Sequence, residues 1–239
     1  MQFKDFLPAI IALSIMMFRN TELSNKCLDK KHFITGAFFD NRYKRWTLLS
    51  DSQARRAFDM LTRAEQAYAQ RQAAEMIRKA GITITDTEAQ SIEVVDFGLS
   101  NLEKEGVQVL TLVQTERISI KVLVLFPNQT EPEHWHPPVG DDPGKEETVR
   151  IIAGTVYFYI PGDDTLQAGF IVEGKGDLYT MRKEVVMKPA DQITLAPGEK
   201  HWFQAREEGA VMYSFSTIAR DALDGFTDPD IKRVTKLID

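Results

Sequence analysis

The stretch from residue 107 to residue 216 is a succession of short apolar runs broken by turn-forming residues. Residues 107–113 and 118–126 are rich in β-branched and long apolar side chains, which favour strands. So many short strands predict a mainly β chain that closes into a sandwich or barrel of the jelly-roll type. Further strands are predicted at residues 148–152, 155–160, 184–187, 192–195, 202–205 and 210–216, with turns at Gly154, Pro161-Gly162, Pro197-Gly198 and Glu208-Gly209.

Two helices are predicted ahead of these strands. Residues 62–80 are rich in good helix formers, and Thr62 with Glu65 has the spacing of a capping box, in which each side chain satisfies a free backbone N–H. A second box of the same kind, Thr85 with Glu88, opens a shorter helix that ends near Ile92.

Residues 1–59 differ in character from the rest. Residues 6–18 form an apolar run that is shorter than the ~20 residues of a membrane-spanning helix. Lys4 before the run permits a signal peptide, but no small-x-small cleavage pattern follows it. We therefore predict an N-terminal extension over residues 1–59 and one domain over residues 60–239, with Met60 as the natural start.

Charge and cysteine content narrow the function classes. The formal net charge of −6 disfavours a nucleic-acid-binding role, which usually needs a basic face. Cys27 is the only cysteine, so no internal disulfide can form, and a reducing cytoplasm is the simplest compartment. We predict a cytoplasmic protein that binds neither nucleic acid nor membrane.

Three of the four histidines fall in two short segments. In a strand, His134 and His136 point to the same face, and Glu147 and His201 are the further candidates. Imidazole and carboxylate together suit a divalent Mn, Fe, Co, Ni or Zn ion. Three imidazoles and one carboxylate leave an octahedral ion two open positions, which two adjacent oxygens of a substrate could fill. We predict His134, His136, Glu147 and His201 as the metal ligands.

These residues carry a family resemblance. His134-x-His136, Glu147-x6-Gly154 and Pro197-Gly198-x-x-His201 resemble the two metal motifs of the cupin superfamily, although residues 137–146 lengthen the usual gap before the glutamate. From about Gly81 onward the chain resembles the short bacterial D-lyxose isomerases, which are cupin-fold ketol-isomerases, and the long gap matches them too. The matching stretches are LVLFPNQTEPEHWHPP, GKEETVR, KHWFQAREEGAV and FSTIARDALDGFTDPDI.

The resemblance implies a cupin-type jelly-roll β-barrel with one or two preceding α-helices. It also implies bound Mn²⁺, a homodimer, and an aldose–ketose isomerase that interconverts D-lyxose and D-xylulose, with D-mannose and D-fructose as a side activity. Spacing to Gly154 and the resemblance both favour Glu147 over its neighbour Glu146 as the carboxylate ligand.

An aldose–ketose isomerase must move hydrogen between C1 and C2, which needs an acid or base near the metal. Lys121 is the first candidate, because an inward lysine in the apolar stretch ISIKVLVLF is costly without a partner or a task. The resemblance carries a lysine there as well. The alternative is that Lys121 lies on the outer face of an edge strand. Glu184 is the second candidate, as acid/base or as a binder of sugar hydroxyls, and an outward orientation is its alternative.

Two other functions share this ligand set. A metal-dependent cupin oxygenase or oxidase would use the open positions for O₂. A non-enzymatic, sugar-sensing cupin module would bind a sugar without turnover. Residues 1–59 show no helix-turn-helix signature, and a complete metal-ligand set disfavours a purely binding role.

Overall fold

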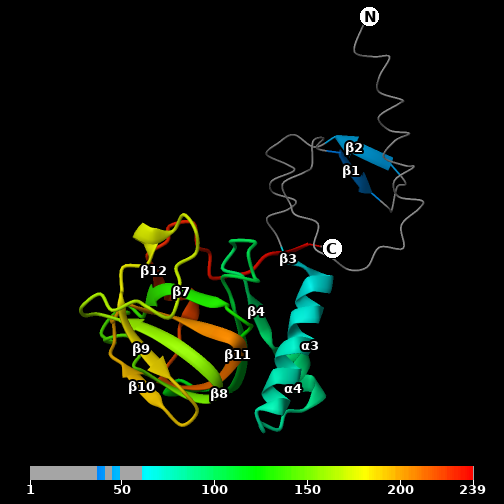
Figure 1. The fold of residues 1–239 in the computed structure, drawn as a ribbon. Helices are drawn as coiled ribbons and strands as arrows, with labels where there is room; N and C mark the ends of the chain where they lie inside the picture. Colours follow the sequence, from blue (N-terminus) through cyan, green and yellow to red (C-terminus); the bar gives the residue numbers. More distant parts are fainter. Residues whose placement is uncertain (1–36, 41–44, 49–60, 239) are drawn as a thin grey trace, which may run out of the picture. The chain divides into compact units, whose positions relative to one another are not determined.

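The computed structural model describes residues 37–40, 45–48 and 61–238, and the chain divides into two compact units, Met1–Ala54 and Arg55–Asp239 (Figure 1). In the first unit, β1 (Ala37–Asp40) and β2 (Arg45–Leu48) form an antiparallel pair. The predicted apolar run and the proposed start at Met60 lie outside the described residues. Among the helices that are described, none has the length and apolar character needed to cross a bilayer.

The second unit is built on a nine-stranded antiparallel sheet that curls into a barrel (Figure 1). The prediction of a mainly β, cupin-type jelly-roll barrel is confirmed. Its strands are β4 (Glu93–Val95), β5 (Val107–Gln114), β6 (Ile118–Leu125), β7 (Thr130–Trp135), β8 (Glu147–Ile160), β9 (Lys183–Met187), β10 (Gln192–Leu195), β11 (His201–Thr217) and β12 (Gly225–Phe226).

The strand order follows the path β10-β8-β11-β6-β5-β4. Off this path, β7 pairs with both β11 and β12, and β9 pairs with β8. A separate parallel pair joins β3 (Leu61–Thr62) to β13 (Leu237–Ile238). Because β6 lies between β5 and β11, it is an interior strand of the sheet and not an edge.

Two long strands replace four predicted short ones. The predicted turns at Gly154 and at Glu208-Gly209 are wrong, because β8 and β11 run through both positions without ending. The register between the two strands shifts next to these glycines, so they form bulges that bend the strands. Gly154 has φ +80°, and a Cβ there would collide with the carbonyl oxygen of Gly209. Glycine at position 154 therefore permits a close backbone approach inside the sheet.

Both predicted capping boxes are confirmed. They begin α3 (Arg63–Lys79) and α4 (Asp86–Ser91), and the Thr62 and Thr85 hydroxyls accept hydrogen bonds from the backbone N–H groups of Glu65 and Glu88. Figure 1 shows the two helices beside the sheet. The buried face of α3 packs against outward-facing residues of β6, so the sheet has a covered outer surface here. This cluster includes Ala73, Ala74, Ile77, Val122 and Val124.

The barrel interior is apolar at one end and polar at the other. On β6, Leu123 and Leu125 belong to the main core, and strand alternation puts Lys121 on the same inner face. On β11, Met212 is in the core and Ser214 follows it, opposite Lys121. The inner faces of neighbouring strands therefore change from apolar to polar at the same level, and the candidate site lies there.

Candidate metal centre and active site

Three histidines meet at the polar end of the barrel. His134 lies on β7, His136 follows that strand directly, and His201 begins β11 opposite His134 in the strand register. Each offers a ring nitrogen within 4.8 Å of the others, and all three residues are buried. The strands thus bring together the three histidines that the sequence singled out.

Two of these rings have a fixed tautomer. The Nδ1 atoms of His134 and His201 each lie 2.8 Å from a backbone carbonyl oxygen, that of Pro132 and that of Glu199. Since a carbonyl only accepts, Nδ1 carries the proton and Nε2 presents a lone pair. Burial lowers the pKa of His201 to about 4 and that of His134 well below its ordinary value, so both rings are neutral.

The arrangement fits a divalent metal. Nε2 of His201 is buried and has no hydrogen-bond partner among the described residues. An unpaired polar atom in this setting is costly unless something else satisfies it. A histidine that binds a metal through one ring nitrogen usually donates the N–H of its other ring nitrogen to a backbone carbonyl or a carboxylate. The histidine cluster therefore has the donor chemistry of the predicted centre.

His136 lies between two carboxylates. Its Nε2 is 3.0 Å from Oε2 of Glu147, and its Nδ1 is 2.9 Å from Oδ1 of Asp224. Burial alone would lower the pKa of His136, but the hydrogen bonds to Asp224 and Glu147 outweigh burial and raise it. Asp224 thus orients this ring, as an outer-shell carboxylate does in many metal sites.

This raised pKa gives a pH prediction. A metal ion can bind Nε2 of His136 only after the proton shared with Glu147 has left, so binding releases a proton. We expect the apparent affinity for a divalent metal to fall as the pH drops through the raised pKa of His136, by about tenfold per pH unit for one proton. Competition titrations with a chromophoric chelator from pH 8 to pH 5.5 would measure this, and a flat profile would contradict the assignment of His136 as a ligand.

Glu147 is held as an ionised carboxylate. Lys145 Nζ lies 3.0 Å from its Oε2, and the Ser214 hydroxyl donates to its Oε1. Burial would raise the pKa of Glu147, but Lys145 and His136 keep it well below the ordinary value. Its neighbour Glu146 is exposed. The structure therefore places Glu147, and not Glu146, beside His136.

Lys121 is buried on the inner face of β6 and pairs with Asp221. The alternative orientation, on the outer face of an edge strand, does not occur. Asp221 belongs to the short 3₁₀ helix η4 (Asp221–Leu223), and its other oxygen is 3.9 Å from Lys145 Nζ. Burial would raise the pKa of Asp221, but the two lysines hold it below its ordinary value. Lys121 is thus a partnered cation at the polar end of the barrel.

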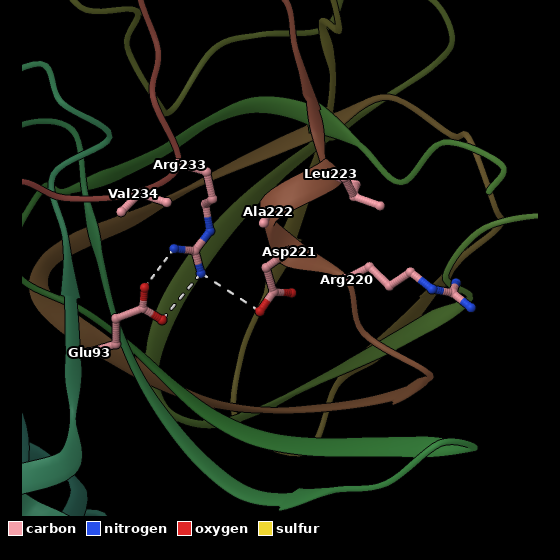
Figure 2. A pocket seen from close by; sticks show the side chains of 7 residues that line it. All are labelled: Glu93, Arg220, Asp221, Ala222, Leu223, Arg233 and Val234. Atoms are coloured by element: carbon pink, nitrogen blue, oxygen red, sulfur yellow. Dashed lines mark hydrogen bonds and ion pairs between the residues drawn. The ribbon is translucent and has the colours of Figure 1, made fainter.

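Asp221 also lines a pocket of about 320 Å³ (Figure 2). In Figure 2 the Arg233 guanidinium lies between Glu93 and Asp221, at 2.8 Å from Glu93 and 3.7 Å from Asp221. Asp221 therefore links the pocket to the interior lysines. The lining residues are Glu93, Arg220, Asp221, Ala222, Leu223, Arg233 and Val234.

Glu184 has a different environment from the histidines. Its strand neighbours Val185 and Met187 pack in or against the main core, so alternation directs Glu184 to the outer face of the sheet. Its carboxylate accepts hydrogen bonds from the Tyr159 hydroxyl at 2.9 Å and from the backbone N–H of Ala168 at 3.0 Å. These contacts favour a role in holding the loop before β9. The catalytic role assigned to Glu184 from the sequence stays a prediction without a supporting contact.

Replacing Glu184 tests the two roles. For Glu184→Gln we expect a loss of about 1–3 kcal/mol in the free energy of unfolding, because a charged acceptor of several hydrogen bonds is removed. We expect kcat/KM to stay within about threefold of the unmodified value, since a loop anchor contributes nothing to the chemical step. Urea unfolding and steady-state kinetics would measure both, with the exposed Glu116→Gln as the matched control. A collapse of kcat at unchanged stability would support catalysis by Glu184 instead.

Sequence reasoning missed four charged residues of this site: Glu131, Lys145, Asp221 and Asp224. A glutamate before a proline in a strand was the available signal for Glu131, because proline in a strand marks an edge or a bulge. Asp221 and Asp224 lie far along the chain from their partners, and no local pattern distinguishes them. Lys145 precedes two glutamates, a pattern that is typical of a solvent-exposed charged segment.

Glu131 owes its position to such a bulge. His201 pairs with His134 and Phe203 pairs with Glu131, so between these pairs two residues of β7 oppose one residue of β11. Both Glu131 and His134 therefore face the same side. Oε1 of Glu131 lies 3.9 Å from Nε2 of His134, and Oε2 is buried without a hydrogen-bond partner in the described part of the chain. Burial and the nearby charge of Glu147 raise the pKa of Glu131 to about 8.

Solved structures share the fold of the barrel unit. L-ribose isomerase from Cellulomonas parahominis superposes with a TM-score of 0.62 and 13% sequence identity, over 75% of this chain and 99% of that one. L-ribose isomerase from Acinetobacter sp. DL28, solved with L-ribose, gives a TM-score of 0.62 and 12% identity over the same shares of the two chains. At this level of identity the likeness concerns the fold.

Sequence relatives are much closer. A D-lyxose ketol-isomerase of Cohnella laeviribosi is 48% identical over 163 residues, which cover 67% of this chain and 89% of the relative. A D-lyxose/D-mannose isomerase of Thermosediminibacter oceani is 45% identical over 181 residues, 75% of this chain and 100% of the relative. The family model described as D-lyxose isomerase matches residues 58–239. This chain therefore belongs to the D-lyxose isomerase family.

Proposed function

We propose that this protein is a metal-dependent aldose–ketose isomerase that interconverts D-lyxose and D-xylulose. The observation that carries the proposal is the buried cluster of three neutral or carboxylate-held imidazoles beside the ionised Glu147 and the partnered Lys121. Membership of the D-lyxose isomerase family supports the substrate class. The name of the T. oceani relative supports D-mannose as a second substrate.

His134, His136, Glu147 and His201 would hold the divalent metal. Imidazole and carboxylate donors favour a borderline or hard ion, and we propose Mn²⁺ on the strength of the family resemblance. When bound, such an ion supplies Lewis acidity and a template for two adjacent sugar oxygens.

The protein's own side chains would control the proton. Asp221 holds the Lys121 ammonium in the barrel, so Nζ can donate a proton to a sugar oxygen and later recover it. Lys145 and Ser214 fix Glu147 in its ionised form. The apolar residues deeper in the barrel, such as Leu123 and Met212, exclude water from one side of the site and strengthen these charge interactions.

An anaerobic assay tests the function. The full chain is stripped with EDTA and reloaded separately with Mn²⁺, Co²⁺, Zn²⁺ or Mg²⁺, and each form is incubated with a panel of aldopentoses and aldohexoses. We expect ketose formation without O₂, fastest with D-lyxose and absent from the stripped protein. Turnover that requires O₂ would support the oxygenase alternative, and metal-independent sugar binding without turnover would support a sugar-sensing module.

The family resemblance also motivates a homodimer, and the single cysteine motivates a cytoplasmic location. Light scattering on the purified chain would test the first, where a monomer at micromolar concentration would contradict it. Fractionation of the source cells would test the second.

The N-terminal extension gives a further prediction. We expect a chain that begins at Met60 to keep its sugar isomerase activity within about twofold, because the family match starts at residue 58 and every site residue lies after it. Metal content and kcat/KM of the short and full chains, measured side by side, would check this. Loss of activity in the folded short form would show that residues 1–59 take part in function.

A further inference from the structure

We propose that Glu131 binds a hydroxyl of the sugar next to the reacting carbons and thereby takes part in the choice of substrate. This inference rests on the proposed isomerase function. Glu131 would then help to determine substrate specificity, although it is not part of the metal-binding motifs.

The first argument is position. The bulge in β7 directs Glu131 and His134 to the same inner face. Oε1 of Glu131 lies 3.9 Å from Nε2 of His134, which is the lone-pair nitrogen of that ring. A sugar whose oxygens occupy the space beside this nitrogen brings its neighbouring hydroxyl within reach of Glu131. The intervening Glu133 faces the other way and binds the backbone of Thr180 and Met181.

The second argument is the missing partner. The fold supplies hydrogen-bond donors to every fully buried acid in the described part of the chain. The Glu131 side chain is 15% exposed, but its Oε2 atom is buried and, unlike the oxygens of those acids, receives no hydrogen bond from the described residues. Such a group costs stability unless a ligand satisfies it. The acids with protein donors are Asp96, Glu105, Glu133, Glu147 and Asp228.

The third argument is chemical class. A carboxyl oxygen accepts hydrogen bonds whether or not the group carries a proton, and a sugar presents hydroxyl donors on successive carbons. Epimers differ in the direction of one hydroxyl, so an acceptor fixed beside the candidate metal ligands distinguishes them. A site built around such a bond rejects an analogue that lacks the hydroxyl much more strongly than an apolar pocket rejects a missing methylene, because the buried carboxyl oxygen stays unpaired.

The experiment uses the full-length, metal-loaded protein and two variants, Glu131→Gln and Glu131→Leu, with the exposed Glu116→Gln as control. Melting temperature and metal content are measured first. For Glu131→Leu we expect KM for the preferred aldose to rise about 10- to 100-fold with kcat within about threefold, and a smaller rise for the glutamine variant, which keeps one acceptor oxygen.

Mono-deoxy sugars sharpen the test. In the unmodified protein, one deoxy analogue should bind much more weakly than its parent, and in Glu131→Leu that difference should shrink to about twofold or less. If the leucine variant fails to fold, the glutamine variant carries the same comparison. Loss of metal from either variant, a collapse of kcat at unchanged KM, or unchanged kinetics would each overturn the hydroxyl-binding role.

Failure of the proposed function is distinguishable from failure of this inference. Sugar binding by calorimetry needs no turnover, so it reports on Glu131 even if the unmodified protein isomerises none of the sugars. Equal sugar affinity in the unmodified protein and in Glu131→Leu would overturn the inference while leaving the isomerase activity intact.

Discussion

Replacing Glu147 with glutamine is expected to remove most of the bound divalent metal and to reduce isomerase activity at least about 100-fold. The substitution takes away the only predicted carboxylate ligand and the negative charge that balances the buried Lys145, 3.0 Å away. Breaking a buried pair leaves an uncompensated charge, so the metal-free variant should also lose about 3–5 kcal/mol of stability. Elemental analysis, kinetics and chemical denaturation would measure the three effects.

Glu146→Gln is the matched control for this prediction. Glu146 is adjacent in sequence but exposed, so the same change of charge should leave metal content and activity unaltered. Greater metal loss at position 146 than at position 147 would overturn the ligand assignment. A Glu147→Gln protein that is less stable but keeps its metal would show that this carboxylate pairs with Lys145 and does not bind the ion.

Replacing Lys121 with methionine is expected to lower kcat by about 10²- to 10⁴-fold while the metal stays bound. Methionine fills a similar volume but has no proton to give, so the packing beside Leu123 is kept and the acid is lost. Asp221 then loses one of its cations, and a moderate fall in stability should accompany the change. Rate measurements across pH, together with metal analysis, would separate chemistry from folding.

Two comparisons make this second prediction specific. Lys188→Met alters an exposed lysine of the same barrel and should leave kcat unchanged. Asp221→Asn keeps Lys121 but removes its counter-ion, so we expect a smaller fall in kcat together with a changed pH profile. A Lys121→Met protein that retains full activity would remove Lys121 from the proposed chemistry.

The clustering of the three histidines was the easiest part of the candidate site to predict. His134 and His136 face one side by strand alternation, and the turn at Pro197-Gly198 places His201 at the start of a strand, where the structure has it. Capping boxes are equally local, so both helix starts were predicted to the residue. Features that depend on a few neighbouring residues can be predicted from the sequence, because distant parts of the fold do not alter them.

Non-local geometry was harder to predict. Gly154 and Gly209 have the composition of turns, yet the strands continue through them because each glycine relieves a close contact with another strand. The inward orientation of Lys121 and the outward orientation of Glu184 could not be predicted, since Lys121 has apolar neighbours on both sides and Glu184 lies between Lys183 and Val185. Only the packing of Leu123 and Val185 against the core sets these orientations.

The placement of Asp221 and Asp224 has a consequence for biosynthesis. His136 receives its outer carboxylate from a residue 88 positions later, and Lys121 receives its counter-ion from one 100 positions later. Until that segment has been translated, His136 and Lys121 lack these partners. We therefore expect a ribosome-stalled chain that ends before Asp221 to capture metal poorly, because it also lacks β12, the strand that pairs with β7 at His134.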